Sequence, residues 1–240
     1  MLVPYSAELG DSTSSDLDGL QPVLIVPVGS VEQHGPHLPL DTDTRIAAAV
    51  VGAVTDRLAG ASRDVLTAPA IAYGASGEHE GFPGTVSIGT TALSGLLIEY
   101  GRSACRWAGQ LVFVNGHGGN AQALADAVAR LRFEGRDAAW CAPSVAGADA
   151  HAGHTETSVL LHLSPEVVRF DRAVPGNRAA LRELLPSMRA GGLAAVSKEG
   201  ILGDPTTASA AAGAQIFAEM VDGCVRRIED WCPDDRGLLI

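Results

Sequence analysis

Short apolar runs alternate along the chain with longer segments in which apolar residues recur at helical spacing. The short runs predict strands at 23–28, 65–71, 111–115 and 137–143. They are apolar throughout and bounded by glycine or polar clusters, as are strands covered on both faces. The longer segments predict helices at 44–58, 91–108, 120–133 and 206–231. This alternation predicts an α/β fold, in which a mainly parallel sheet carries helices on both faces.

The chain has the organisation expected of one domain, residues 1–240. It contains no internal repeat, no low-complexity segment and no convincing linker. A polar stretch, D-S-T-S-S-D-L-D-G at 11–19, predicts a loop. Residues 1–19 are therefore expected to form a mobile N-terminal arm.

Charge and composition exclude several classes of partner. Seventeen basic against 28 acidic residues give a net charge of −11, which argues against binding to nucleic acid or to an anionic membrane. No run of about twenty apolar residues predicts a membrane span, and the first residues do not resemble a signal peptide. The four cysteines are scattered and are expected to be reduced thiols. These features predict a cytoplasmic protein.

Ligand-type side chains crowd the segment after the first predicted strand. The stretch V-G-S-V-E-Q-H-G-P-H-L-P-L-D-T-D contains Glu32, His34, His37, Asp41 and Asp43. Sites in parallel α/β sheets form at the carboxyl ends of the strands, which is where this stretch lies. Glu32 and His34 are two residues apart, so in an extended segment they project from one face. Prolines stiffen the stretch and keep it from becoming a helix.

Two later strand ends carry similar side chains. N-G-H-G-G-N, with His117, follows the third strand, and H-A-G-H-T-E-T-S, with His151 and Glu156, follows the fourth. Each segment alone could be a cap, a surface turn or a solvated helix. Together they favour a site for Zn²⁺, Fe²⁺ or Mn²⁺. Two such ions, about 3.5–4 Å apart, would activate water and polarise an amide carbonyl. No G-x-S-x-G motif occurs, so a covalent nucleophile is the weaker alternative.

Four motifs in this order resemble those of the creatininase (creatinine amidohydrolase) family. They are G-S-V-E-Q-H-G-P-H-L-P-L-D-T-D, G-E-H-E-G-F-P-G-T, N-G-H-G-G-N and H-A-G-H-T-E-T-S. The resemblance implies a three-layer α/β/α sandwich around a mainly parallel sheet. It also implies a homo-oligomer, often a hexamer, and a centre of two divalent metal ions that hydrolyses amides.

The resemblance assigns the ligands of the two ions by motif position. The matching residues are Glu32, His34, Asp43 and His117, with Asp43 in the bridging place. In creatininase proper, a glutamate ligand follows the N-G-H histidine by two residues. Gly119 occupies that position here, and Glu156 is expected to replace the missing ligand. The ions are expected to be Fe²⁺, Zn²⁺ or both, with Mn²⁺ as an alternative.

Further residues receive roles in the same scheme. His151 is expected to be catalytic and to pass a proton to the leaving nitrogen. His37 and Asp41 are expected to support the ligands from a second layer. Residues expected to bind substrate are Glu78, His79, Asn115 and Gly118.

The resemblance also bears on the substrate. Creatininase proper has a glutamate directly before the motif histidine, where this chain has Ala150, so creatinine is not the expected substrate. The run A-D-A-H-A-G-H-T-E-T-S is most similar to the family member of the mycofactocin system. That member is a peptidase that removes a C-terminal Val–Tyr-derived unit from a modified precursor peptide. Two alternatives are a family amidohydrolase acting on a formamide, lactam or creatinine-like substrate, and a non-catalytic metal-binding protein.

Overall fold

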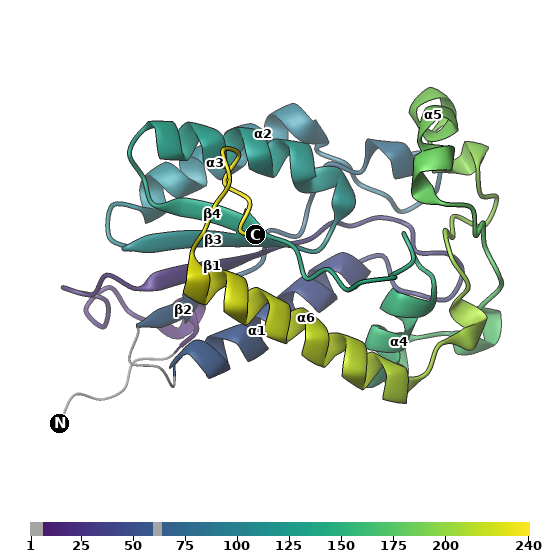
Figure 1. The fold of residues 1–240 in the computed structure, drawn as a ribbon, viewed down its shortest axis with the longest axis horizontal. Helices are drawn as coiled ribbons and strands as arrows, with labels where there is room; N and C mark the ends of the chain where they lie inside the picture. Colours follow the sequence, from purple (N-terminus) through teal and green to yellow (C-terminus); the bar gives the residue numbers. More distant parts are fainter. Residues whose placement is uncertain (1–6, 60–63) are drawn as a thin grey trace.

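The computed structural model describes residues 7–59 and 64–240, which contain a four-stranded parallel sheet. The strand order is β2-β1-β3-β4 (Figure 1). The strands are β1 (Val23–Val28), β2 (Val65–Thr67), β3 (Gln110–Asn115) and β4 (Ala138–Cys141). The parallel sheet predicted from the apolar runs is therefore confirmed.

Helices cover both faces of this sheet. In Figure 1, α2 (Gly89–Ala104) and α3 (Ala121–Phe133) lie above it, and α1 (Thr42–Ala59) and α6 (Ala210–Asp230) lie below it. The short helix α4 (His154–Leu163) packs beside α6 on the lower face. The three-layer α/β/α sandwich is confirmed.

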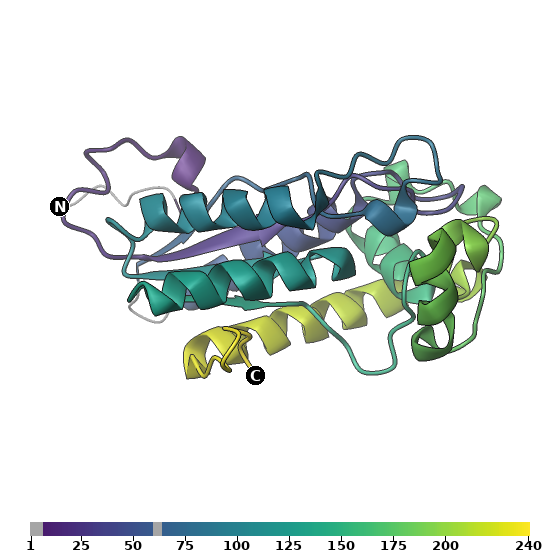
Figure 2. The same cartoon turned by 90° about the horizontal axis from the view of Figure 1, so that it is seen from above.

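Helix α5 (Leu181–Gly191) lies apart from these layers. Figures 1 and 2 both place it at one end of the molecule, beyond the carboxyl ends of the strands. Because a parallel sheet forms its site at that end, α5 is placed to cover such a site.

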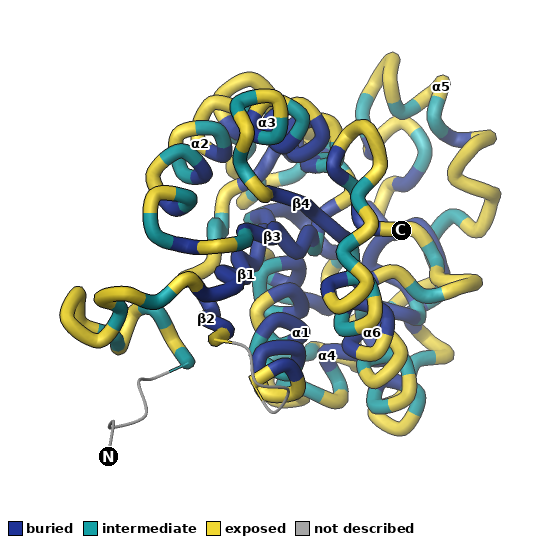
Figure 3. Tube along the Cα trace, turned by 60° about the vertical axis from the view of Figure 1, so that its left-hand side comes forward, coloured by how far each residue is buried: buried dark blue, intermediate teal, exposed yellow. Residues whose placement is uncertain are grey.

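Each face of the sheet contributes to its own apolar core. In β1, Val23 and Ile25 pack with α1, α4 and α6, whereas Leu24 and Val26 pack with α2 and α3. Side chains that alternate along a strand point to opposite faces, so a strand covered twice must be apolar at every position. All six residues of β1 are buried, and Figure 3 shows the same for the centre of the sheet.

Some predicted boundaries differ from the structure. The strand predicted at 65–71 is paired continuously only over Val65–Thr67, and Ile71 adds a single bridge to Val28. Helices α4 and α5 were not predicted. Helix α4 buries Thr155, Thr157 and Ser158, which hides its apolar periodicity, and α5 contains Pro186, a residue that disfavours helix interiors.

The predicted N-terminal arm is only partly described, because residues 1–6 lie outside the described residues. From residue 7 onwards the chain contacts the sheet. The Thr67 N–H donates to the Ala7 carbonyl at 2.8 Å, and Leu9 and Leu17 pack against the core on the α2 side. Ala7, Leu9 and Leu17 therefore contact the rest of the fold, and the mobility of the arm stays a prediction.

Two further expectations concern the cysteines and membrane-spanning helices. All four cysteines are free thiols. Among the described residues, no helix combines the length and the apolarity that a membrane crossing requires.

Candidate metal centre and active site

Five ligand-type side chains converge at the carboxyl ends of the strands. Glu32 and His34 come from the loop after β1, His117 follows β3, Asp43 lies in the first turn of α1, and Glu156 in the first turn of α4. The loop after β1 is closed by a hydrogen bond from the Glu32 N–H to the Leu40 carbonyl at 2.9 Å. This hydrogen bond brings the chain back to the start of α1, so that Asp43 faces the loop residue His34.

Asp43 lies between two groups of potential ligands. Its Oδ1 lies 3.1 Å from His34 Nε2, and its Oδ2 lies 3.4 Å from His117 Nδ1. On one side, His117 Nδ1 also lies 3.2 Å from Glu32 Oε2. On the other, His34 Nε2 lies 3.8 Å from Glu156 Oε2. The two oxygens of Asp43 therefore face different sets of ligand-type atoms.

Within the described part of the chain, three trios of side chains have ligand atoms within 4.8 Å of one another. They are Glu32–Asp43–His117, His34–His151–Glu156 and Glu32–His79–His151. The third trio was not expected from the sequence, which assigned His79 to substrate binding. His79 Nε2 lies 3.3 Å from Glu32 Oε1, so this side chain borders the cluster as well as the cavity.

The carboxylates of the cluster are buried without full hydrogen bonding. Glu32 and Asp43 are 0% and 2% exposed, yet both oxygens of Glu32 and Oδ2 of Asp43 have no hydrogen-bond partner. Leaving such charged oxygens unpaired is costly in a protein interior. Carboxylate oxygens in this setting, next to imidazole nitrogens, fit the ligand set of a divalent cation such as Zn²⁺, Fe²⁺ or Mn²⁺.

The same carboxylates shift the pKa values of two neighbouring histidines. Burial opposes a charge on His34, but Asp43 together with Glu156 and Glu32 raises its pKa to about 10. Burial likewise opposes a charge on His117, and Glu32 with Asp43 raises its pKa to about 9. Without a cation, protons on these rings therefore balance the carboxylates. A divalent ion would take over that role and displace them.

Burial dominates the pKa shifts of Glu156, His79 and His151. It raises the pKa of Glu156 to about 7, with Asp43 and Glu32 adding to the effect. It lowers the pKa of His79 to about 4 and that of His151 well below its usual value. His151 is therefore neutral at pH 7, the form in which one ring nitrogen can accept a proton and the other can donate one.

His117 is held from the side of its ring that faces away from the cluster. Its Nε2 lies 3.2 Å from the Ser76 hydroxyl and from the Ala75 carbonyl, and 3.6 Å from Glu78 Oε1. These contacts leave Nδ1 to face Glu32 and Asp43. An orienting contact on the second nitrogen is usual for a histidine that binds metal.

Gly119 stands where this packing leaves no room for a side chain. A Cβ there would lie 2.4 Å from His117 Nε2, 2.4 Å from the Ala75 carbonyl and 2.7 Å from Glu78 Oε1. The Glu78 carboxylate thus borders the space that a longer residue at 119 would need. Two carboxylates that come from elsewhere in the chain, Glu78 and Glu156, lie close to the cluster instead.

Glu156 is fixed by a strained turn. Ala152 has φ 51°, in the left-handed region that non-glycine residues rarely adopt, and its N–H donates to Glu156 Oε2 at 2.6 Å. The preceding residue, His151, pairs with Leu202 through backbone hydrogen bonds. Backbone strain of this kind persists where surrounding contacts enforce it, often at functional sites.

Gln33 connects three parts of the site and was not singled out in the sequence. Its amide nitrogen lies 3.1 Å from His79 Nδ1 and 3.1 Å from His151 Nε2, and donates to the Gly200 carbonyl at 2.9 Å. Only its position between Glu32 and His34 could have drawn attention to it, since its partners are distant in the sequence.

The other expected site residues lie at varied distances from the cluster. Asn115 shapes the loop around His117, to which its side chain is hydrogen-bonded, and Gly118 lines the cavity. His37 is buried, and its Nε2 lies 2.8 Å from the Thr157 hydroxyl of α4. Asp41 instead pairs with Arg45 at the surface, with its side chain 43% exposed. The structure therefore does not bring Asp41 into the second layer where it was expected.

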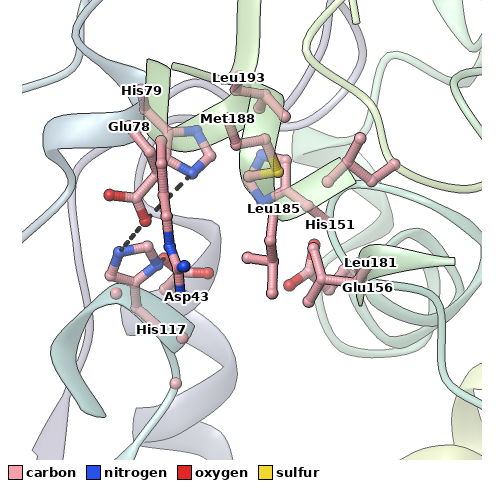
Figure 4. Close-up of a pocket in the computed structure, with 16 residues that line it drawn as sticks. Asp43, Glu78, His79, His117, His151, Glu156, Leu181, Leu185, Met188 and Leu193 are labelled. Atoms are coloured by element: carbon pink, nitrogen blue, oxygen red, sulfur yellow. Dashed lines mark ion pairs between the residues drawn. The ribbon is translucent and has the colours of Figure 1, made fainter. Parts of the chain in front are cut away.

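A cavity of about 380 Å³ opens onto the cluster (Figure 4). Its polar side is formed by Asp43, Glu78, His79, His117, His151 and Glu156. Apolar side chains also line the cavity, largely from α5, with Leu181, Leu185 and Met188, and the same helix contributes Arg189. A substrate held there would have its amide bond beside the acidic residues and histidines.

Comparison with known proteins identifies relatives across nearly the whole chain. The family model described as creatinine amidohydrolase matches residues 10–228. A mycofactocin precursor peptide peptidase from Mycolicibacterium smegmatis is 66% identical over 238 residues, covering 99% of this chain and 96% of that protein. A protein of the same name from Mycobacterium tuberculosis is 63% identical over 242 residues, with the same shares covered.

Solved structures share the fold. A creatininase of the Zn-Zn type superposes with a TM-score of 0.79 at 26% identity, covering 96% of this chain and all of that one. A creatininase described as the Mn form gives a TM-score of 0.78 at 27% identity, covering 95% and 100%. One of these two proteins of the same architecture is thus a zinc form and the other a manganese form.

Replacing His37 with glutamine should make folding less sensitive to acid. Burial, with the charge of His34, lowers the pKa of His37 to about 4 in the folded chain, against 6.5 as its ordinary value. The unfolded state therefore takes up a proton that the folded state resists. The stabilisation from neutral His37 is present above pH 6.5 and is lost as the pH falls towards 4.

Urea denaturation of chelator-treated protein between pH 7 and pH 4 measures this effect. The free energy of unfolding should fall by about 2–3 kcal/mol more in the unaltered chain than in His37→Gln. Chelation removes metal release as a cause, and the other titrating groups are common to both proteins. If the free energy of unfolding fell equally with pH in the two proteins, His37 would not be held neutral by the fold.

Proposed function

The chain belongs to the creatininase family, and from that premise we propose that it is a metal-dependent peptidase acting on a mycofactocin precursor peptide. The reaction is hydrolysis of an amide bond. The released part is the C-terminal Val–Tyr-derived unit that the motif resemblance implies. Identity of 66% across 99% of the chain supports this substrate over other amides of the family.

One observation carries the proposal more than any other. Buried Glu32 and Asp43 direct carboxylate oxygens without hydrogen-bond partners at His117 Nδ1, and the second oxygen of Asp43 lies 3.1 Å from His34 Nε2. A pair of divalent ions, when bound, supplies an activated water and stabilises negative charge on the carbonyl oxygen. The chain's own residues must hold these ions, position the peptide and move protons.

We assign the ligands of the two ions from the distances around Asp43. Glu32, Asp43 and His117 would hold one ion, and His34, Asp43 and Glu156 the other. Asp43 would then contribute to holding both. The candidate metals are zinc and manganese, the metals of the two creatininase structures above, and iron, since histidine and carboxylate ligands accept all three.

Glu156 is the better candidate for the ligand that Gly119 lacks. Its carboxylate faces His34 on the side of Asp43 Oδ1, where the second ion would need it. Glu78 faces the Nε2 of His117, away from the nitrogen that meets the other carboxylates. We therefore assign Glu78 to orienting His117 and to lining the cavity.

His151 is placed to transfer the proton that the leaving nitrogen requires. It lines the cavity beside Glu156, and its Nε2 lies 2.9 Å from the Gln33 carbonyl and 3.1 Å from the Gln33 amide nitrogen. A neutral imidazole held in this way can accept a proton from water and deliver it to the amine that departs.

Three further properties belong to the same proposal. The chain acts as a single domain, assembles as a homo-oligomer as the family resemblance implies, and works in the cytoplasm on a peptide rather than on nucleic acid or membrane. The net charge of −11 supports the exclusion of nucleic acid and anionic lipid.

Replacing Asp43 with alanine should remove metal and activity together. Because this carboxylate serves both sets of ligands, the variant should lose most of the two ions per chain. Its kcat/KM should fall by more than the roughly hundredfold lost when a residue that only orients a ligand is changed. Elemental analysis and peptide cleavage measure the two effects.

Asp41→Ala is the matched control, since Asp41 lies two residues upstream and pairs with Arg45 at the surface. It should keep both ions and full activity. A well-folded Asp43→Ala protein with normal turnover would refute the proposed centre.

Replacing His151 with alanine should separate metal binding from turnover. If His151 moves a proton rather than holding an ion, the variant should retain metal and lose about 10²- to 10⁴-fold in kcat. The same elemental analysis and cleavage assay apply. Loss of one ion in the variant would instead show that His151 is a ligand. That role is compatible with the two trios in which its ligand atom lies close to those of Glu156 or Glu32.

The substrate is tested directly with the metal-loaded protein. The precursor peptide carrying its C-terminal modification should be cut to release the C-terminal unit, as detected by mass spectrometry. Creatinine, a formamide and a lactam should remain intact under the same conditions. Hydrolysis of a small amide with no peptide cleavage would favour the other family activity, and two bound ions with no hydrolysis at all would favour a non-catalytic metal-binding protein.

A further inference from the structure

The apolar side of the cavity is built by residues outside the four family motifs. Helix α5 supplies Leu181, Leu185 and Met188, whose spacing of four and three residues places them on one face. Leu193 and Leu202 complete this side. We name these five residues the apolar wall; Figure 4 shows four of them around the acidic residues and histidines.

The wall is attached to the fold through a small separate cluster. Leu184 is the only buried residue of α5, and it packs with Leu193 and Leu202 rather than with either core of the sheet. The wall face of α5 remains open, since Leu181 is 43% exposed and Leu185 and Met188 are half-buried. Apolar side chains left in water beside a cavity favour a ligand that covers them.

A second, smaller cavity of about 200 Å³ adjoins the first. The two cavities share Gly116, His117, Gly118 and Glu156. The second is lined by polar residues, which include Ser144, Asp149 and Thr155, and by apolar ones such as Val145 and Met220. Two cavities that meet at the cluster give room for a peptide on both sides of the cleaved bond.

We propose that the apolar wall binds the side chains of the unit released from the C-terminus, and so selects peptides whose last residues are bulky and apolar or aromatic. The second cavity then receives the chain that precedes the cleaved bond. This inference rests on the proposed peptidase function. The cavity of about 380 Å³ lies within the range of about 300–1,000 Å³ that encloses ligands larger than a single small ring.

The test measures binding separately from cleavage. Metal-loaded His151→Ala protein is titrated with two synthetic decapeptides that differ only at the end, Val-Tyr in one and Ala-Ser in the other. We expect the Val-Tyr peptide to bind about ten- to a hundredfold more tightly, from burial of its larger side chains. In the same background, Leu185→Gln and Met188→Gln should reduce this ratio to near one.

Arg182→Gln is the control, because Arg182 is on the same helix but its side chain is 86% exposed and it does not line the cavity. It should leave the ratio unchanged, and elemental analysis should find the same metal content in all variants. Equal binding of the two peptides, or a ratio that survives both wall substitutions, would overturn the inference. Failure of the unaltered protein to cleave any peptide would instead overturn the peptidase function, whatever the binding ratio.

Discussion

The structure depends on the burial of two carboxylates that the protein alone does not satisfy. Glu32 and Asp43 lie at the carboxyl ends of buried strands, and three of their four carboxylate oxygens have no hydrogen-bond partner. Their charge can be balanced there only by protonated histidines or by cations. The raised pKa values of His34 and His117 are the response of the metal-free chain to this constraint. The same geometry makes the cluster a strong candidate for two divalent ions.

The fold brings these groups together from segments far apart in the sequence. Strands β1 and β3 are neighbours and parallel, so the loops that follow them meet at one edge. Gly116 allows the loop after β3 to approach the first turn of α1 closely, since a Cβ there would lie 2.5 Å from the Asp43 carbonyl. Contacts of this kind leave little freedom in where Asp43 and His117 can stand.

Much of this could be predicted from the sequence because the local signals were strong. Uniformly apolar strands indicated a sheet covered on both faces, and Glu32, His34 and Asp43 followed the first of them within a few residues. The family motifs then indicated that His117, which follows the third predicted strand, would join them. These predictions concern groups whose placement follows from the end of a strand.

Other features depend on contacts that the sequence does not encode locally. Gln33 gains importance only from His79, His151 and Gly200, which lie 46 to 167 residues away. The surface position of Asp41 follows from its pairing with Arg45 in α1, which sequence reasoning did not weigh against a role near the cluster. The wall of α5 was missed because Pro186 weakens the helical signal.

Two differences from the creatininase pattern that the motif resemblance implies lie close to the cluster. Gly119 stands where that pattern has a glutamate ligand, and Glu78 borders the space there. Ala150 stands where it has a glutamate directly before the motif histidine. Both changes leave the proposed ligands on either side of Asp43 in place. They alter the surroundings of the substrate, which is where a peptidase and a creatinine hydrolase would be expected to differ.

The most direct test of this account is anomalous diffraction from crystals grown with Mn²⁺ or Zn²⁺. The account predicts two peaks, one on each side of the Asp43 carboxylate and about 3.5–4 Å apart. One would lie beside Glu32 and His117, the other beside His34 and Glu156. A single peak that does not involve Asp43, or ions bound only elsewhere on the chain, would contradict it.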